Sequence, residues 1–449
     1  MTLTRPLRRT VLHLSLLALC AGSAPLALSQ TAAAATPRAP MAHLPWTKNA
    51  TIYEVNLRQY SQAGTINALT DDLPRLKKLG VEILWLMPIH PIGQHNRKGT
   101  LGSYYASQNY TAVAPEYGSL DDLRHLVKQA HASGMKVMLD WVANHTAWDN
   151  PWVSQHPDWF KKNAKGEIFS VTFTNEEGGI EEWTDVVGLD YTNKDLWKGM
   201  TDAMAFWVRE ADIDGFRCDA AGLVPTPFWD QARAELEKIK PLFMLAEWNQ
   251  PDLHERAFDM TYDWDFGEVL LQIGAGKAGA EALRNYVTKP PKTYPRDAYR
   301  MLFTNNHDVN SWKNTDQGLY GAAYPVLAVL SFTLPGMPLI YNGQEAGLNK
   351  KLEFFEKDPI DWKGPTHAGF YSKLIKLRKN NPALWSGQYG GPVQLLNVGN
   401  DKVFAFQRQQ GSNRVSVYAN LSDAAQRYTP PGGKPATLPA WGWDIVAPQ

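Results

Sequence analysis

Eight short apolar segments alternate along the chain with longer segments whose apolar positions recur every three or four residues. The short segments are rich in β-branched, leucine and aromatic residues, as is typical of strands covered on both faces. They are Thr51–Asn56, Val81–Met87, Lys136–Asp140, Ile213–Asp219, Leu242–Glu247, Asp259–Tyr262, Tyr299–Thr304 and Pro338–Tyr341. This alternation predicts an α/β fold, a parallel (β/α)8 TIM barrel with right-handed crossovers. A doubly wound open sheet is the alternative, but no glycine-rich phosphate loop follows the first strand.

The segments between the strand candidates carry helix signals at both ends. The clearest apolar stripe is Ile66, Leu69, Leu73, Leu76 and Leu79. Gly80 follows it, at the place where a left-handed residue commonly ends a helix. Ser119 and Asp122 form an acidic variant of a capping box before the next stripe. These signals predict helices that pack one apolar face against the barrel.

Two regions depart from a bare barrel. Residues 145–188 form a long polar and aromatic stretch after the third strand candidate, and a connection of this length is usually functional. Val403–Phe406 and Val415–Tyr418 are short strand signals separated by a glycine-containing turn. We therefore expect a catalytic barrel over residues 44–385 with a subdomain inserted at 145–188, and a C-terminal all-β sandwich domain over 386–449.

The N-terminus has the layout of a secretory signal peptide. Arg5, Arg8 and Arg9 precede an apolar stretch from Val11 to Leu19, which is too short to span a bilayer. Small residues follow, so cleavage is expected between residues 29 and 36. A twin-arginine signal is a second interpretation of Arg8 and Arg9, although their flanks match weakly. We expect residues 1–29 to be a signal peptide and the protein to be exported, to the periplasm or the extracellular space.

Composition narrows the classes of function. Lys and Arg together number 45, as do Asp and Glu, and no basic run stands out beyond the N-terminus. Neither nucleic acid nor an anionic membrane is therefore an expected partner, and no obligate protein partner is evident. Many of the 17 tryptophans must pack in the core, but indole also packs against the flat C–H face of a sugar. Cys218, the lone cysteine beyond the signal, is expected to be a small buried hydrophobe.

A carboxylate closes or follows several of the apolar segments. The residues are Asp140, Asp219, Glu247 and Asp308. One such carboxylate can be a structural ion pair, because burying a charge at the end of a strand is costly. Four of them, on strands separated by helical stretches, indicate an active site at the C-terminal mouth of a barrel. Several carboxylates in one pocket suggest the chemistry of glycosidic bonds.

Glycosidases that retain the anomeric configuration need one ionised carboxylate and one protonated carboxylic acid. Asp219 follows Arg217 on the same face of its strand, and we expect the guanidinium to lower the pKa of Asp219 and keep it ionised as a nucleophile. Glu247 ends an apolar run and precedes Trp248, so we expect burial to raise its pKa and make it the acid. Asp308 is expected to hydrogen-bond sugar hydroxyls and to help distort the ring.

Six short segments that include these residues occur in a fixed order. They are Gly102–Tyr105, Asp140–His145, Gly215–Ala220, Ala246–Glu247, Asn306–Asp308 and Gly336–Glu345. This ordered set resembles the signature segments of the α-amylase family of glycoside hydrolases. The resemblance implies that Asp219 is the nucleophile, Glu247 the acid/base and Asp308 the acid that stabilises the transition state. It also implies a barrel with an inserted domain and a C-terminal β-sandwich, acting on α-linked glucose polymers or oligomers.

Other residues in these segments are expected to bind substrate. Tyr105 matches the tyrosine that, in the family, stacks on the sugar at the cleaved bond. Asp140, His145 and His307 follow strand ends, where they can hydrogen-bond sugar hydroxyls. Arg217 is expected to pair with the nucleophile. For Asp140, a helix-capping or ion-pairing role is an alternative.

The chain also departs from the family pattern. Gly222 and Leu223 stand where many relatives have a Lys-His pair that shapes the leaving-group side and a calcium site. The loop after Asn56 lacks the calcium-binding pattern of some members, and Asn144 alone is a thin basis for a cation that needs six to eight oxygen ligands. We therefore predict no metal site and no required cofactor. Calcium, which some relatives bind, is not supported by these residues.

Three hypotheses about function follow. The leading one is an exported retaining glycoside hydrolase that cleaves α-glucosidic bonds, α-1,4 bonds in the first place, in starch-like polysaccharides, maltooligosaccharides or cyclodextrins. A transglycosylase would use the same residues and pass the glucosyl group to another sugar instead of water. An inactive barrel that binds glucan or a protein partner is the third. The intact carboxylates argue against it, because a binding module does not need one ionised and one protonated carboxyl group.

Overall fold

The structure is a computed structural model that describes residues 41–174, 178–363 and 366–448. The predicted signal peptide, residues 1–29, lies outside the described residues, so export stays a prediction. Within the described part of the chain, no helix is long and apolar enough to cross a membrane.

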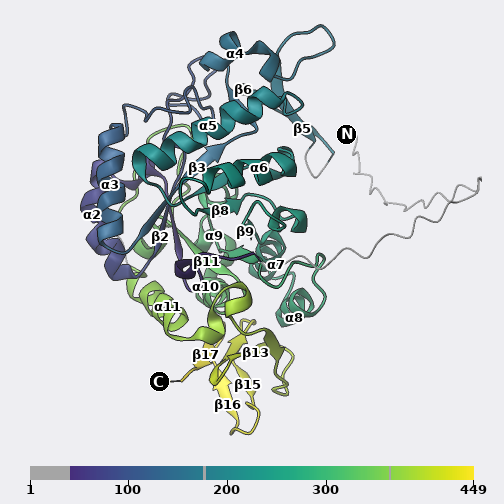
Figure 1. Cartoon of the computed structure of the whole chain (residues 1–449). Helices are drawn as coiled ribbons and strands as arrows, with labels where there is room; N and C mark the ends of the chain where they lie inside the picture. The colour runs from purple at the N-terminus through teal and green to yellow at the C-terminus, as the bar shows by residue number, and fades with distance from the viewer. Residues whose placement is uncertain (1–40, 175–177, 364–365, 449) are drawn as a thin grey trace, which may run out of the picture. The chain divides into compact units, whose positions relative to one another are not determined.

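Eight parallel strands of the described chain close into a barrel (Figure 1). They are β1 (Ile52–Val55), β2 (Ile83–Leu86), β3 (Lys136–Val142), β7 (Gly215–Asp219), β8 (Phe243–Ala246), β9 (Met260–Tyr262), β10 (Tyr299–Leu302) and β11 (Met337–Tyr341). Each strand pairs with the next along the chain, and β11 closes the barrel by pairing with β1, where Ile52 lies opposite Leu339. The strands match the predicted segments to within about two residues, and the predicted (β/α)8 barrel is confirmed.

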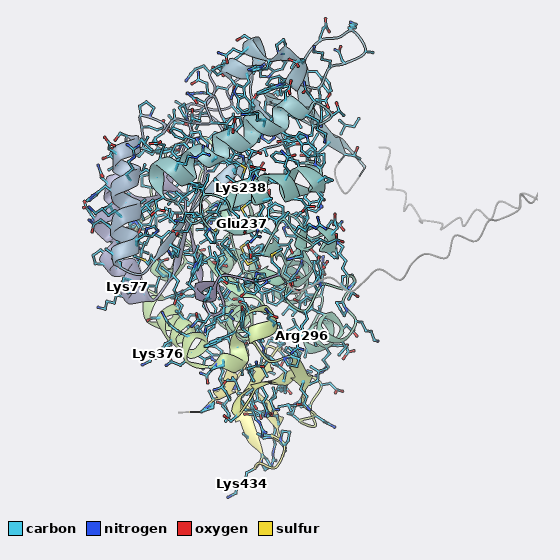
Figure 2. The ribbon with its side chains drawn as sticks, in the orientation of Figure 1. Lys77, Glu237, Lys238, Arg296, Lys376 and Lys434 are labelled. Atoms are coloured by element: carbon cyan, nitrogen blue, oxygen red, sulfur yellow. The ribbon has the colours of Figure 1, made fainter. Side chains whose placement is uncertain are left out.

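Helices follow the strands and cover the outside of the barrel (Figure 1). They are α1 (Leu57–Tyr60), α2 (Ile66–Leu79), α3 (Leu120–Ala132), α5 (Lys194–Ala211), α6 (Thr226–Leu236), α7 (Trp264–Gly274), α8 (Ala280–Thr288), α9 (Asp316–Tyr320), α10 (Tyr324–Thr333) and α11 (Ala368–Asn380). The predicted caps are confirmed: Gly80 ends α2 at a φ of 108°, and Ser119 and Asp122 form a reciprocal capping box before α3. Lys77 of α2 and Lys376 of α11 are exposed on the outer side (Figure 2). These helices therefore turn their apolar faces toward the strands.

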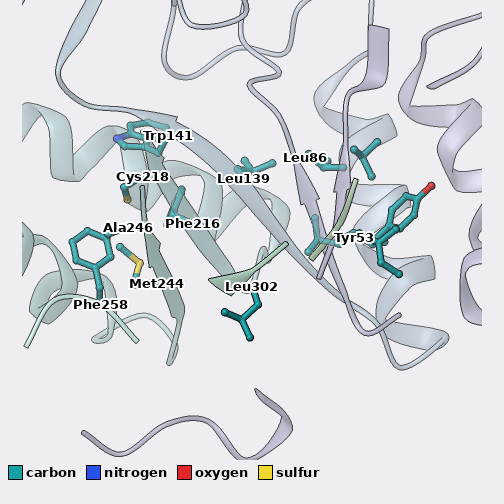
Figure 3. Packing of buried hydrophobic residues seen from close by; sticks show 14 of the residues in the cluster. Tyr53, Leu86, Leu139, Trp141, Phe216, Cys218, Met244, Ala246, Phe258 and Leu302 are labelled. Atoms are coloured by element: carbon teal, nitrogen blue, oxygen red, sulfur yellow. The ribbon is translucent and has the colours of Figure 1, made fainter. Parts of the chain in front are cut away.

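Alternation along the barrel strands separates two sets of buried side chains. Outward-facing residues such as Leu139, Phe216 and Cys218 belong to the apolar cluster between strands and helices (Figure 3). Met138 and Leu245 face the other way and belong to the cluster that fills the barrel. Successive side chains of a strand point to opposite faces, so a residue two positions further along returns to the interior. The predicted burial of Cys218 is confirmed.

A small sheet interrupts the barrel between β3 and β7, where an insert was predicted. Its antiparallel strands are β4 (His145–Ala147), β6 (Ile180–Gly188) and β5 (Ser170–Thr174), in that order across the sheet, and α4 (Pro151–Gln155) follows β4. Trp159 packs its indole over Gly199 of α5, where an added Cβ would lie 2.4 Å from the ring. The missing side chain at Gly199 therefore lets the insert anchor on the barrel.

The C-terminal region is all β, as predicted. One antiparallel sheet consists of β12 (Val393–Leu395), β13 (Val403–Gln410), β14 (Asn413–Asn420) and β17 (Trp443–Val446), and β15 (Gln426–Tyr428) pairs with β16 (Ala436–Leu438). Tyr418 of the first sheet and Tyr428 of the second share one apolar cluster. Arg408 of β13 is fully buried and donates hydrogen bonds to the carbonyls of Thr333 and Leu334 at the end of α10. This side chain ties the C-terminal domain to the barrel.

Candidate active site

Polar residues at inner positions gather at the C-terminal mouth of the barrel. Glu54 lies in β1, Asp140 in β3, Arg217 and Asp219 in β7, and Glu247 directly after β8. In β1, β3 and β8 the residue two positions earlier belongs to the apolar cluster that fills the barrel. The strand periodicity therefore places these charges directly above a layer that excludes water.

Arg217 is the centre of this group and is fully buried. Its Nη1 donates hydrogen bonds to Asp140 Oδ1 at 2.9 Å and to Asp219 Oδ1 at 3.0 Å. Its Nη2 lies 2.7 Å from Glu247 Oε1, an ion pair without the angle of a hydrogen bond. One guanidinium thus brings together a carboxylate of β3, the expected nucleophile and the expected acid. The alternative of an ion-pairing role for Asp140 agrees with this contact.

Burial disfavours charge on all of these carboxyl groups. It raises the pKa of Asp140 and of Asp219 to about 6 and that of Glu247 to about 7, while Arg217 opposes each rise. The prediction that Arg217 lowers the pKa of Asp219 below its ordinary value is therefore wrong. A single guanidinium is shared among several carboxylates, and their mutual repulsion adds to the cost of burial. The predicted upward direction for Glu247 is confirmed.

The backbone after Asp219 is bent toward Glu247. Ala220 has a φ of 43° and a ψ of 40°, a left-handed conformation that costs a non-glycine residue about 1–2 kcal/mol. In this conformation the Ala220 N–H donates a hydrogen bond of 2.8 Å to Glu247 Oε2. The strained residue therefore links the two carboxyl groups on which the expected chemistry depends.

A second wall of the site is built by Tyr105, His307 and Asp308. The Tyr105 hydroxyl donates to Asp140 Oδ2 at 3.2 Å and lies 2.8 Å from His307 Nε2. The Tyr105 ring stacks on the imidazole with 5.6 Å between centroids. His307 Nε2 is also 3.3 Å from Asp308 Oδ2, and its Nδ1 is 2.5 Å from Glu54 Oε1. Tyr105 is thus held by its hydroxyl as well as by its ring.

His145 lies at the start of β4, where the insert leaves the barrel. Its ring is buried and meets Trp183 edge to face at 5.5 Å between centroids. Burial lowers the pKa of His145 to about 4, so the ring is neutral near pH 7. A neutral imidazole has one N–H and one acceptor nitrogen, and Nδ1 of His145 already lies 3.1 Å from Asn144 Nδ2.

A cavity of about 560 Å³ opens over these residues. Its lining includes six of the residues expected from sequence: Tyr105, His145, Asp219, Glu247, His307 and Asp308. Asp140 and Arg217 lie beneath the cavity floor and are 1% and 0% exposed. The structure therefore brings all eight expected residues into one site, six at the surface of the cavity and two supporting them from below. Their individual roles stay predictions.

Several aromatic residues of the cavity were not expected. Trp312, Phe354 and Phe355 form one side, with 5.1 Å between the centroids of Trp312 and Phe354, and Phe173 and Trp183 of the insert also contribute. Phe354 and Phe355 follow the last barrel strand in a segment without strand or helix periodicity, so no local signal marks them. Adjacent aromatic residues in an irregular segment were the one available hint.

Glu54 and Trp85 were also missed. Both are fully buried at inner positions of β1 and β2. Trp85 Nε1 donates to Asp140 Oδ2 at 3.1 Å, and Glu54 contacts His307. In sequence they look like ordinary members of apolar strands. A glutamate inside such a strand was the signal that could have singled out Glu54.

A larger cavity, of about 670 Å³, lies elsewhere, among residues of α2 and α11. Its carboxylates Asp72 and Glu345 both pair with Arg75, at 2.8 Å each. Arg75 and these two carboxylates thus form a structural ion-pair network. The expected catalytic residues do not line this cavity. The smaller cavity is the better candidate for chemistry.

Among the described residues, no group of three or more His, Cys, Asp or Glu side chains is arranged to hold a metal ion. Calcium also binds carbonyl and amide oxygens, so this observation leaves the expectation of a calcium-independent protein as a prediction.

Comparison with known proteins shows which sequences this chain resembles. A sequence profile described as alpha amylase, catalytic domain, matches residues 47–365. Alpha-amylase MalA of Haloarcula japonica is 28% identical over 402 residues, which cover 87% of this chain and 58% of that protein. An alpha-1,4-glucan:maltose-1-phosphate maltosyltransferase of Burkholderia pseudomallei is 27% identical over 401 residues, covering 80% of this chain and 33% of that protein. The chain thus spans less than two thirds of the length of these curated relatives.

A crystal structure of an alpha-amylase from Lactobacillus plantarum superposes with a TM-score of 0.79 and 30% identity. The match covers 89% of this chain and 99% of that one. The matched region therefore extends beyond the barrel into the C-terminal domain.

Proposed function

Because the chain belongs to the alpha-amylase family, we propose that it is an exported retaining glycoside hydrolase that cleaves α-1,4-glucosidic bonds in starch-like polysaccharides, maltooligosaccharides or cyclodextrins. The observation that carries the proposal is the placement of Asp219 and Glu247. Both line one cavity, and both contact the guanidinium of Arg217. A double displacement needs two carboxyl groups of this kind at a single anomeric centre.

In the first half of the reaction, Glu247 donates its proton to the glycosidic oxygen while Asp219 attacks the anomeric carbon. Burial raises the pKa of Glu247 to about 7, which favours its protonated form, while the ion pair with Arg217 favours the charged form of Asp219. The Ala220 N–H and Arg217 keep the Glu247 carboxyl group in place. The bond between the anomeric carbon and the glycosidic oxygen breaks, the leaving sugar departs as an alcohol, and a glycosyl ester remains on Asp219.

In the second half, Glu247 takes a proton from water, and the water attacks the same carbon. The sugar is released with its original anomeric configuration. Tyr105 supplies a ring to stack on the sugar, and Asp308 and His145 supply hydrogen-bonding groups at the cavity surface. The aromatic side formed by Trp312, Phe354 and Phe355 would receive neighbouring glucose units.

The purified protein tests this with soluble starch, a cyclodextrin, pullulan and short maltooligosaccharides. Release of reducing sugar with the α configuration in the first-formed product, followed by NMR, is the expected result. The Glu247→Gln variant should lose glucan hydrolysis but keep far more of its activity on α-glucosyl fluoride, because fluoride leaves without a proton. Inverted product, or equal loss on both substrates, would contradict the assigned roles.

A transglycosylase is the second candidate function. The similarity to a maltosyltransferase supports it, since the barrel and its carboxyl groups serve transfer as well as hydrolysis. Analysis of products at high maltooligosaccharide concentration separates the two. Products longer than the substrate would favour transfer, and shorter products alone would favour hydrolysis.

The proposal of export is supported by the arginines and the apolar stretch of residues 1–29. Expression of the full chain, followed by mass measurement of the product outside the cytoplasm, tests it. We expect a mass that corresponds to a chain starting between residues 30 and 37. An uncleaved intracellular protein would contradict export.

A further inference from the structure

Glu54 is a buried carboxylate whose hydrogen-bonding contact is with a residue of the site wall. It is the third residue of β1, it is 0% exposed, and it does not line the cavity. Its Oε1 lies 2.5 Å from His307 Nδ1, and its Oε2 has no hydrogen-bond partner among the described residues. A carboxylate is costly to bury without a positive partner. The location of Glu54 therefore makes sense only together with the imidazole of His307.

The other nitrogen of the ring also faces oxygen atoms. His307 Nε2 is 2.8 Å from the Tyr105 hydroxyl and 3.3 Å from Asp308 Oδ2. Neutral histidine has a single N–H, whereas both nitrogens of the imidazolium donate. Carboxylate oxygens on both sides of the ring, with the Tyr105 proton already directed to Asp140, call for a donor at each nitrogen.

The charges around the His307 ring also favour the imidazolium. The titratable and charged groups that face it are Glu54 from β1, Tyr105 from the loop after β2, Asp140 from β3, Arg217 from β7 and the adjacent Asp308. Burial and Arg217 disfavour a positive ring, but Asp308 and Glu54 outweigh them and raise the pKa of His307 to about 9.

We propose that Glu54 is a positioning residue that keeps His307 as an imidazolium at working pH and, through it, fixes the hydroxyl and ring of Tyr105. The chain of contacts runs from Glu54 to His307, from His307 to the Tyr105 hydroxyl, and from that hydroxyl to Asp140. The imidazolium also presents a positive charge to Asp308 at the cavity surface. Glu54 thus acts on the sugar-binding wall without touching the sugar.

The first test measures the charge of His307 directly and needs no substrate. In ¹⁵N-labelled protein, the two ring nitrogens of an imidazolium have nearly equal chemical shifts, and those of a neutral ring differ widely. The chain has 11 histidines, so comparison with the His307→Gln variant assigns the signal. We expect the unmodified protein to show imidazolium shifts at neutral pH, with titration only near the pKa of about 9.

The Glu54→Gln variant keeps the shape and removes the charge. Loss of a neighbouring opposite charge should lower the ratio of protonated to neutral His307 at a given pH by at least about tenfold. Glu54→Asp keeps a carboxylate and should retain part of the charge on the ring. The kinetic part of this test rests on the proposed function: for Glu54→Gln we expect kcat/KM on maltooligosaccharides to fall progressively more as pH rises, with partial recovery in Glu54→Asp.

Asp259→Asn is the matched control. Asp259 is also a fully buried carboxylate, 2.8 Å from a histidine, His43, but at the amino end of the barrel. Its loss should lower stability without moving the titration of His307 or the shape of the pH profile. A neutral His307 in the unmodified protein would overturn the proposal even if Glu54→Gln does not fold. So would a Glu54→Gln protein in which the titration of His307 and the pH profile are both unchanged. An imidazolium in a protein that attacks no glucan would instead overturn the proposed function alone.

Discussion

Two buried arginine–carboxylate groups lie at opposite ends of the barrel and differ in the balance of charge. At the C-terminal mouth, one guanidinium, that of Arg217, contacts the three carboxyl groups of Asp140, Asp219 and Glu247. At the amino end, Asp259 receives Arg233 at 2.9 Å, together with His43 and a backbone N–H. Three carboxyl groups share one arginine at the mouth, whereas the single carboxylate Asp259 at the amino end has Arg233 and His43 as partners.

The pKa values follow that balance. Burial opposes ionisation at both ends, but Arg233, His43 and the Met244 N–H outweigh it and lower the pKa of Asp259. At the mouth burial prevails and raises the pKa of Glu247 to about 7. Whether a carboxylate of the barrel is held in its charged form therefore depends on how far its charged and hydrogen-bonding partners offset the cost of burial.

The largest expected effect is on catalysis at the mouth. Asp219→Asn should reduce kcat on an α-glucan by about four orders of magnitude or more, because no other carboxylate can form the glycosyl ester. Circular dichroism and thermal melting should show a folded protein, since Arg217 keeps Asp140 and Glu247 as partners. Near-normal hydrolysis by this variant would refute the nucleophile assignment.

Asp259→Asn should lower stability and leave catalysis unchanged, the opposite of Asp219→Asn. Removing the charge of Asp259 leaves the largely buried Arg233 with the half-exposed Glu237 as its acidic partner, and should lower the free energy of unfolding by about 3 kcal/mol, measured by urea denaturation. The rate per folded molecule should stay unchanged, because Asp259 is remote from the cavity. A selective loss of kcat with normal stability would break the comparison between the two ends.

Glu247→Gln should stabilise the protein while it inactivates it. The raised pKa of Glu247 means that its charge is disfavoured in the folded state, so the amide should add about 1–3 kcal/mol to the free energy of unfolding at alkaline pH. The gain should be full above the folded pKa of about 7. It should vanish as pH falls to the ordinary glutamate value of about 4, where Glu247 is already protonated in the unmodified protein.

Parallel melting curves of the two proteins across this pH range measure that difference. Glu235→Gln, at an exposed carboxylate that pairs with Lys238 outside the site, controls for a general effect of removing a negative charge. Destabilisation by Glu247→Gln at alkaline pH would show that Arg217 compensates Glu247 more fully than we infer.

The smallest expected effect is that of a chelator. EDTA followed by desalting should leave both the activity and the melting temperature unchanged, because arginine supplies the positive charge at the mouth. Added calcium should then change neither quantity. If the activity or the melting temperature falls after chelation and calcium restores it, a metal contributes to one end of the barrel.

The fold and the core of the site were largely predictable from sequence. The strand limits and the caps at Gly80 and Ser119 depend on neighbours in the chain, so local patterns marked them. Asp219 and Glu247 were found because each carboxylate interrupts an apolar run at a strand end. The direction of the Asp219 pKa was predicted wrongly, since two residues of sequence context showed Arg217 but not the other carboxylates that share it.

The sequence by itself determined the alternation of strand and helix, and with it which residues point into the barrel and which ends of the strands carry charge. These properties follow from backbone periodicity and the burial of apolar side chains. Only the tertiary structure decided that Phe354 joins the aromatic side of the cavity and that Glu54 meets His307 across 253 positions of chain. Contacts of that kind depend on how the barrel closes. The balance of charge in the site depends on charged residues that several different strands contribute.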